Sequence, residues 1–200
     1  MNNRRFEIIK CAERRFVRHG AAKSTLDEIA RDLRIGKATI YHYFESKEEL
    51  YFTVLRNQID EFCKFLDEAF LKEDLPHADK IRLYLKTKLE FPQKYPLLFS
   101  ILKEAFEEFP IKEEKELFQE LVQKENLTIQ KYFDTFPKKS KNRVKWNNLI
   151  PGLPLMTYTF SLAINIENKL LEEKKTDAIE KWMKLINDEL LFEEDQSVSS

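Results

Sequence analysis

Apolar residues recur three and four positions apart along most of this 200-residue chain, which is the spacing of one face of an α-helix. The segment 26–33 is typical, since its apolar positions fall on a single stripe that would face a core, namely Leu26, Ile29, Ala30 and Leu33. Alternation with a period of two is not sustained anywhere. The pattern therefore predicts an all-α protein with about nine helices.

The helix boundaries follow from caps and prolines. A first helix is expected to end near Gly20, where glycine can adopt a left-handed backbone. Short helices at about 26–33 and 37–44 follow, and then a long helix over 47–72. All seven prolines lie from Pro76 onward and delimit five further predicted helices, at 78–91, 96–109, 112–136, 143–173 and 176–193. We expect an N-terminal head, residues 1–60, and a larger helical body, residues 61–200.

Residues 25–44 have the pattern of a helix-turn-helix, two short helices joined by a tight turn at 34–36. Thr25 with Glu28, and Ser46 with Glu49, each fit the capping box that marks the start of a helix. The second short helix has two apolar residues four apart on one side, Ile40 and Phe44, which would anchor it to the core. Opposite them, Ala38 and His42 point away, with Thr39 and Tyr41 as flanking residues. Such a helix can enter a DNA major groove while its back packs on a neighbour.

The charge distribution agrees with a DNA-binding head. Residues 1–47 hold 11 Lys and Arg against 6 Asp and Glu, whereas residues 48–200 hold 23 against 29. Lys37 stands at the start of the predicted recognition helix, and Lys47 lies beside the next helix N-terminus, where a phosphate is favoured. A basic head on an acidic body predicts DNA binding through the head alone, with affinity that falls steeply with salt.

The run IGKATIYHYFESKEEL at 35–50 resembles the TetR family of bacterial transcriptional regulators. The resemblance is strong over about the first 60 residues and weak beyond them. It implies an all-α homodimer with a three-helix DNA-binding head and a body that dimerises and usually binds a small inducer. It also implies phosphate or base contacts from Thr25, Lys37, Ala38, Thr39, Tyr41, His42 and Lys47.

Two residues depart from the family pattern. Arg34 stands at a turn position where the family often has glycine, and a left-handed backbone there would cost a non-glycine residue about 1 kcal/mol. Gly36 stands where serine is commoner, which predicts a weaker N-cap for the recognition helix.

In the body, the sequence Pro151-Gly152-Leu153-Pro154 predicts a kink or break in an apolar helix. Aromatic and large apolar residues near this kink form a candidate ligand pocket, made of Phe106, Trp146, Met156, Tyr158 and Phe160. The alternative is that they are ordinary core and interface residues. Dimerisation is expected through the last two helices, at Ala163, Ile166, Leu170, Ile179, Trp182, Met183, Ile186 and Leu190. Alternatively, these stripes only close the core of the monomer.

Other classes of protein find little support. The two cysteines fall within helical patterns, and the chain has neither a signal peptide nor 18 consecutive apolar residues, so a cytoplasmic protein without a membrane span is expected. The three histidines lie far apart, and no catalytic or nucleotide-binding fingerprint occurs, so no metal, cofactor or enzyme activity is expected.

Two functions remain. The preferred one is a transcriptional regulator, a repressor by analogy, that binds a palindromic double-stranded DNA operator and is released by a small apolar or aromatic effector. The alternative is a ligand-independent dimeric DNA-binding or architectural protein, whose body only dimerises or recruits a protein partner.

Overall fold

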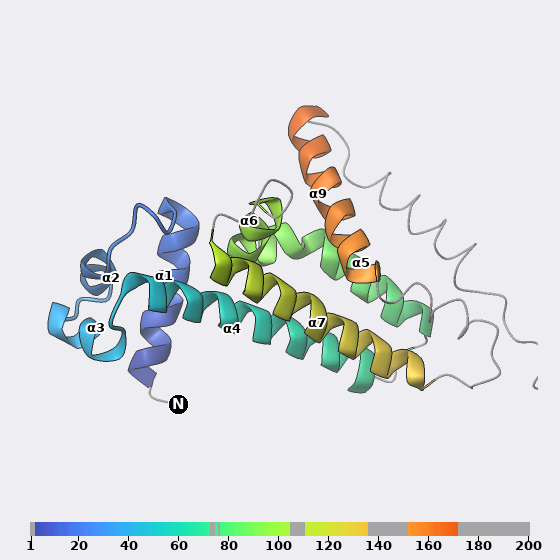
Figure 1. The fold of residues 1–200 in the computed structure, drawn as a ribbon, viewed down its shortest axis with the longest axis horizontal. Helices are drawn as coiled ribbons and strands as arrows, with labels where there is room; N and C mark the ends of the chain where they lie inside the picture. The colour runs from blue at the N-terminus through green and yellow to red at the C-terminus, as the bar shows by residue number, and fades with distance from the viewer. Residues whose placement is uncertain (1–2, 73–74, 76, 105–110, 136–151, 172–200) are drawn as a thin grey trace, which may run out of the picture.

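A computed structural model describes residues 3–72, 75, 77–104, 111–135 and 152–171 (Figure 1). These residues form eight α-helices and one π-helical turn, with no strand among them, so the predicted all-α fold is confirmed. The elements are α1 (Asn3–His19), α2 (Leu26–Asp32), α3 (Lys37–Tyr43), α4 (Lys47–Asp67), η1 (Glu68–Lys72), α5 (His77–Lys94), α6 (Pro96–Glu104), α7 (Lys112–Asp134) and α9 (Leu153–Leu171). Within this part of the chain, no helix has the length and apolar character that a membrane span requires.

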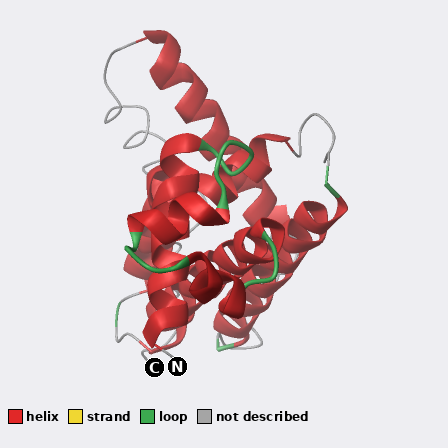
Figure 2. Cartoon of the chain, turned by 90° about the vertical axis from the view of Figure 1, so that its left-hand side faces the viewer, coloured by secondary structure: helices red, strands yellow, loops and turns green. Residues whose placement is uncertain are grey.

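The first three helices gather at one end of the molecule, and α4 runs from this end along α7 into the body (Figure 1). Helices α6 and α9 also pack on α7, and α5 packs on α6, α9 and η1. The view in Figure 2 shows the helices bundled with short loops between them. The boundary predicted after residue 60 lies inside α4, so one continuous helix connects head and body. Motion of this helix would therefore move both parts.

One apolar core extends through both parts of the molecule. In the head, Ile8 and Phe16 of α1 pack with Ile29 of α2, and all three are buried. In the body, Phe62 of α4 lies edge-on to Phe91 and Tyr95, with ring centroids 5.2 and 5.6 Å apart. The spacing of apolar residues in the sequence thus corresponds to real helix faces.

Two helix ends use a left-handed backbone. Gly20, with φ +82°, ends α1, and its N–H donates to the carbonyl of Phe16 at 2.9 Å. Arg34 ends α2 with φ 54°, as its place in the turn predicts. There the N–H of Ile35 donates to the carbonyl of Ala30, and that of Arg34 donates to Arg31, both at 3.0 Å, which together form a Schellman motif. The turn therefore keeps its usual hydrogen bonds despite the bulkier residue.

These two ends predict opposite effects of substitution. Arg34→Gly should raise the free energy of unfolding by about 0.5 kcal/mol, because glycine adopts positive φ without steric cost. Gly20→Ala should lower it by about 1 kcal/mol through backbone strain alone, since a Cβ there would meet no atom within 4 Å. Urea unfolding of both variants measures the two changes. Loss of stability in Arg34→Gly would show that the arginine side chain contributes more than its backbone costs.

Three local expectations need correction. Helix α5 does not end at residue 91 but runs through Pro92 to Lys94, because a proline in the last turn removes only one intrahelical hydrogen bond. The predicted 47–72 helix is α-helical only to Asp67 and then widens into η1, where Lys80 Nζ donates to the carbonyl of Phe70 at 2.8 Å. The second capping box is shifted, since the Glu49 carboxylate accepts from the N–H of Glu45 and not from that of Ser46.

Some predictions fall outside the described residues. They include the helix expected at 176–193, the first part of the helix expected at 143–173, and the end of the helix expected at 96–109. Of the Pro151–Pro154 segment, the structure describes Gly152 onward, and α9 begins at Leu153.

Candidate nucleic-acid interface

Helix α3 is held to the head by the two residues that the sequence singled out as its anchor. Ile40 and Phe44 are completely or almost completely buried. The guanidinium of Arg5, on α1, lies 4.9 Å from the centre of the Phe44 ring. Tyr43 is half-buried against the same core. One side of α3 is therefore committed to the interior.

The opposite side of α3 faces solvent. Ala38 and His42 are exposed, Tyr41 has half of its surface accessible, and Thr39 is half-buried. Gly36 gives this helix an extended N-cap residue without a side-chain hydrogen bond, which is the weak cap that the sequence predicts. The structure thus places four of the predicted DNA contacts together on one short helix. They include small, polar and aromatic groups, the kinds that contact base edges and phosphates in a major groove.

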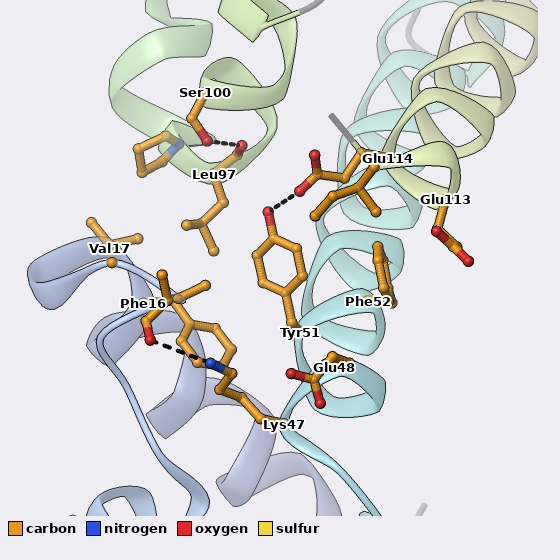
Figure 3. A pocket seen from close by; sticks show the side chains of 15 residues that line it. Phe16, Val17, Lys47, Glu48, Tyr51, Phe52, Leu97, Ser100, Glu113 and Glu114 are labelled. Atoms are coloured by element: carbon orange, nitrogen blue, oxygen red, sulfur yellow. Dashed lines mark hydrogen bonds between the residues drawn. The ribbon is translucent and has the colours of Figure 1, made fainter. Parts of the chain in front are cut away.

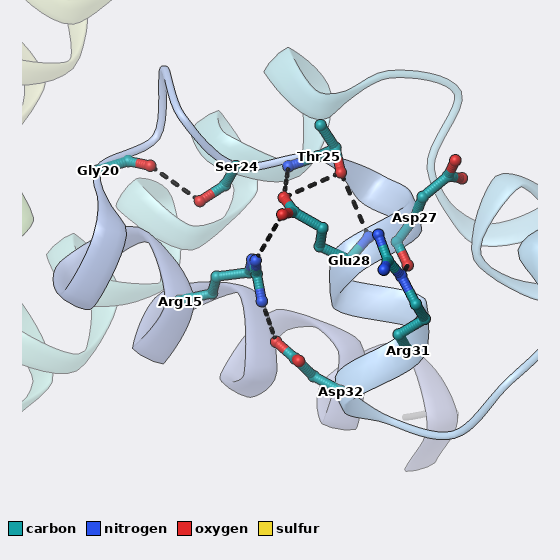
Figure 4. Close-up of polar contacts among 8 residues, drawn as sticks. All are labelled: Arg15, Gly20, Ser24, Thr25, Asp27, Glu28, Arg31 and Asp32. Atoms are coloured by element: carbon teal, nitrogen blue, oxygen red, sulfur yellow. Dashed lines mark hydrogen bonds and ion pairs between the residues drawn. The ribbon is translucent and has the colours of Figure 1, made fainter.

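The start of α2 is fixed by its capping box (Figure 4). The hydroxyl and the N–H of Thr25 both donate to the carboxylate of Glu28, at 3.0 and 2.9 Å, and the Glu28 N–H donates back to the Thr25 hydroxyl. These hydrogen bonds, together with nearby Arg15, hold the pKa of Glu28 below its usual value. Thr25 is exposed but already engaged, so its hydroxyl can offer DNA only its remaining hydrogen-bonding capacity.

Arg15 connects α1 with α2 and neutralises two acids of the head. Its guanidinium contacts Glu28 at 2.9 Å and Asp32 at 2.6 Å (Figure 4). Hydrogen bonding to Asp32 raises the pKa of Arg15. Between α1 and α4, the amide of Gln58 on α4 donates to Glu13 of α1 at 2.7 Å. Polar contacts therefore hold α2 on α1, and α1 on α4.

The two predicted lysines lie at the edges of the α3 surface and have local partners. Lys37 is exposed and forms an ion pair with Asp27 of α2. Lys47, half-buried at the start of α4, donates to the carbonyl of Ala22 at 3.4 Å. The Lys37 ion pair is exposed to solvent and the Lys47 hydrogen bond is long, so each lysine can exchange its partner for a phosphate.

A contact between head and body was not found from the sequence. Tyr51, on the first turns of α4, donates its hydroxyl to Glu114 of α7 at 2.9 Å, across 63 residues of sequence. No local pattern signals such a pair, because neither residue lies in a motif. It fixes the point where the DNA-binding head meets the body.

Three of the five predicted ligand residues, Met156, Tyr158 and Phe160, lie in the described part of the chain, all on α9. Tyr158 is fully buried, Met156 is 60% exposed, and Phe160 is half-buried. Phe106 and Trp146 lie outside the described residues. Of the predicted interface residues, Ala163 is exposed. The side chains of the others lie outside the described part of the chain, at Ile166, Leu170, Ile179, Trp182, Met183, Ile186 and Leu190.

Tyr158 instead covers a buried ion pair in the body. Lys88 of α5 contacts the two carboxylate oxygens of Glu125, on α7, at 2.5 and 2.7 Å, and both side chains are almost inaccessible. The ammonium lies 3.2 Å from the centre of the Tyr158 ring. Tyr84 donates to Glu125 at 2.7 Å and contacts the hydroxyl of Thr157 at 3.1 Å. Burial lowers the pKa of Lys88 to about 8, because the ammonium has lost its hydration. The Glu125 carboxylate and the aromatic rings stabilise the charge in place of water.

Groups that would indicate other chemistry are not found among the described residues. No cluster of three or more His, Cys, Asp or Glu suited to a metal ion occurs there. Cys11 is buried and Cys63 half-buried, both as free thiols, and burial raises the pKa of each. Their thiolate forms are therefore disfavoured.

Comparison with known proteins agrees with this geometry. Residues 8–54 match the model of the bacterial regulatory proteins of the tetR family. The chain is 28% identical over 159 residues to the uncharacterized HTH-type transcriptional regulator YhgD of Bacillus subtilis, covering 80% of this chain and 78% of that protein. It is 35% identical over 89 residues to the HTH-type transcriptional regulator RutR of Escherichia coli, covering 44% of this chain and 41% of RutR. The reduced form of E. coli NemR has the same fold, with a TM-score of 0.67, 15% identity and coverage of 92% and 95%.

A helix-turn-helix with an anchored second helix, on an all-α body, defines a DNA-binding regulator. The chain belongs to the TetR family of bacterial helix-turn-helix transcriptional regulators. This membership favours the transcriptional regulator over the architectural protein as its function.

Proposed function

We propose that this regulator binds a palindromic operator as a homodimer, with the exposed side of α3 in the major groove. One observation carries the proposal: Ile40 and Phe44 are buried while Ala38, Tyr41 and His42 on the same short helix are exposed. A two-fold dimer would present two such helices to one face of DNA about one helical turn apart. Thr25, Lys37, Thr39 and Lys47 would complete the contacts, and the regulator would act in the cytoplasm.

Selection of bound fragments from a random duplex pool tests the proposal. The full chain should enrich a symmetric site with half-sites about 10 base pairs apart, and sedimentation should give two chains per duplex. Enrichment of no sequence, or of an asymmetric site bound by a single chain, would contradict it.

Release of the operator by a small apolar or aromatic effector in the body completes the proposed function. The aromatic character of the body around Tyr158, whose ring packs against Phe91 and Phe118, supports it. To release the operator, the effector must bind more tightly to the arrangement of the heads in the free protein than to their arrangement on DNA. Screening small molecules for a change in operator affinity tests this step. If operator affinity stays constant across such a screen, the ligand-independent function is supported.

Lys47→Ala and Thr39→Ala separate backbone contacts from base contacts. Lys47→Ala should weaken binding to selected and random duplexes alike and reduce the slope of log K against log salt by about 1, because one phosphate contact is lost. Thr39→Ala should instead change base preference within the half-site. Fluorescence anisotropy at several salt concentrations measures both. Equal effects of the two substitutions on specific and random DNA would argue against this division of roles.

A further inference from the structure

A cavity of about 710 Å³ lies where the head meets the body, and we call it the joint cavity (Figure 3). Helices of both parts form its walls. The head contributes the end of α1 and the loop after it, α4 contributes its first two turns, and the body contributes the starts of α6 and α7. Its apolar walls include Phe16, Val17, Tyr51, Phe52, Pro96 and Leu97. This volume lies in the range of sites that hold small molecules.

The polar groups of the joint cavity are mostly acidic. Its lining includes three carboxylates, from Glu48, Glu113 and Glu114, but only one ammonium, from Lys47. That ammonium is turned to the carbonyl of Ala22. Glu114 is only 4% exposed and accepts the hydroxyl of Tyr51, which stands in the middle of the cavity (Figure 3). A carboxylate beside apolar walls favours a ligand that brings its own positive charge.

We propose that the joint cavity binds a small apolar molecule that carries a protonated amine. The apolar part would occupy the space between Phe16 of α1 and Leu97 of α6, and the ammonium would donate to Glu114 in place of the Tyr51 hydroxyl. This site is separate from the aromatic region around Tyr158 in the body. As a regulatory site, it rests on the proposed function, since its effect is expressed through DNA binding.

Binding there would act directly on the orientation of the head. The Tyr51–Glu114 hydrogen bond joins α4 to α7 at the point where α4 leaves the head. A charged ligand that replaces this bond and separates α1 from α6 favours a different angle between head and body. Two recognition helices held at a fixed spacing on DNA tolerate such a change poorly, so the amine would lower operator affinity.

Three matched probes test the proposal: 1-naphthylmethylamine, naphthalene-1-methanol and 1-naphthoate. They share the aromatic body and differ in charge. Calorimetric titration of the full chain, without DNA, should show the amine binding at least about tenfold more tightly than the alcohol, and the carboxylate more weakly than both. Equal affinities of the three probes, or no binding of the amine, would overturn the proposal.

Two carboxylates of α7 provide a matched pair of variants. Glu114→Gln keeps an acceptor for Tyr51 and removes the charge, and should abolish the preference for the amine while the alcohol binds as before. Glu116→Gln makes the same charge change at an exposed residue of α7 that does not line the joint cavity and pairs with Lys112 instead. It should change amine affinity less than about twofold. Equal loss in the two variants would show that the amine senses only the general acidity of α7 and would refute the site.

Two further variants keep the test decisive if Glu114→Gln folds poorly. Ser100→Phe places a ring into the cavity from α6 and should block both amine and alcohol. Tyr51→Phe removes the competing hydroxyl and should tighten the amine about threefold. If neither variant changes amine binding, the ligand lies elsewhere.

Operator binding then separates the two proposals. We expect the amine to weaken operator binding by the wild type and to leave Glu114→Gln unaffected. A chain that binds its operator but not the amine would refute the joint cavity and leave the proposed function standing. A chain that binds the amine as described but no duplex would refute the proposed function alone.

Discussion

Replacing Lys88 with methionine should lower the free energy of unfolding by about 3–5 kcal/mol, because the substitution leaves the buried Glu125 carboxylate without its counter-charge. Both side chains are at most 2% exposed, so water cannot replace the lost ammonium. Tyr84 would still donate to Glu125, but one hydrogen bond from a neutral hydroxyl does not stabilise an unpaired carboxylate in the core. Urea unfolding followed by circular dichroism measures the loss.

The double variant Lys88→Met/Glu125→Leu should recover most of that stability, since two well-packed apolar residues often match a buried ion pair. Tyr84 would keep Thr157 as its partner. Lys112→Met is the matched control, because Lys112 and Glu116 form an ion pair on the surface, 3.4 Å apart and largely exposed to solvent. It should change stability little. A Lys88→Met variant as stable as this control would show that the buried pair contributes nothing to the fold.

Placing a glutamate at position 38 should weaken operator binding by at least about 100-fold at low salt, because a carboxylate on the exposed side of α3 would face the phosphates of the groove. The substitution should not harm the head itself. Position 38 lies in the first turn of α3, where a negative charge is favoured by the helix dipole. Thermal unfolding checks that the variant is as stable as the wild type.

Asn57→Glu provides the matched control for charge. It adds the same negative charge at an exposed position of α4, more than two turns beyond the start of that helix. It should reduce operator affinity far less than Ala38→Glu, through the long-range field alone. Equal losses of operator affinity in the two variants would mean that α3 does not contact the DNA directly.

The local geometry of the head could be predicted because its causes lie within a few residues of sequence. The four-residue spacing of Ile40 and Phe44 fixes which side of α3 is buried. The Thr25–Glu28 capping box forms as the sequence pattern indicates. The positive φ of Arg34 follows from its place at the end of α2.

The remainder depends on contacts between distant segments. Lys88 and Glu125 are 37 residues apart, and Tyr51 and Glu114 are 63 apart, so no periodicity in the sequence reveals that they pair. The ring of Tyr158 packs on the buried ammonium of Lys88, a contact between distant segments that its aromatic character alone does not reveal. Helix α5 continues past Pro92, where the sequence favoured its end, because Phe91 and Tyr95 both pack on Phe62 of α4 and so stabilise the last turn.

Site-specific photocrosslinking tests most directly whether the exposed side of α3 contacts DNA. Benzoylphenylalanine replaces the aromatic, half-exposed Tyr41 in one sample and the exposed Leu127 of α7 in another, and each is irradiated with the selected duplex. We expect efficient crosslinking from position 41, competed by unlabelled operator, and none from position 127. Crosslinking from position 127 with none from position 41 would show that this protein meets DNA through a different surface.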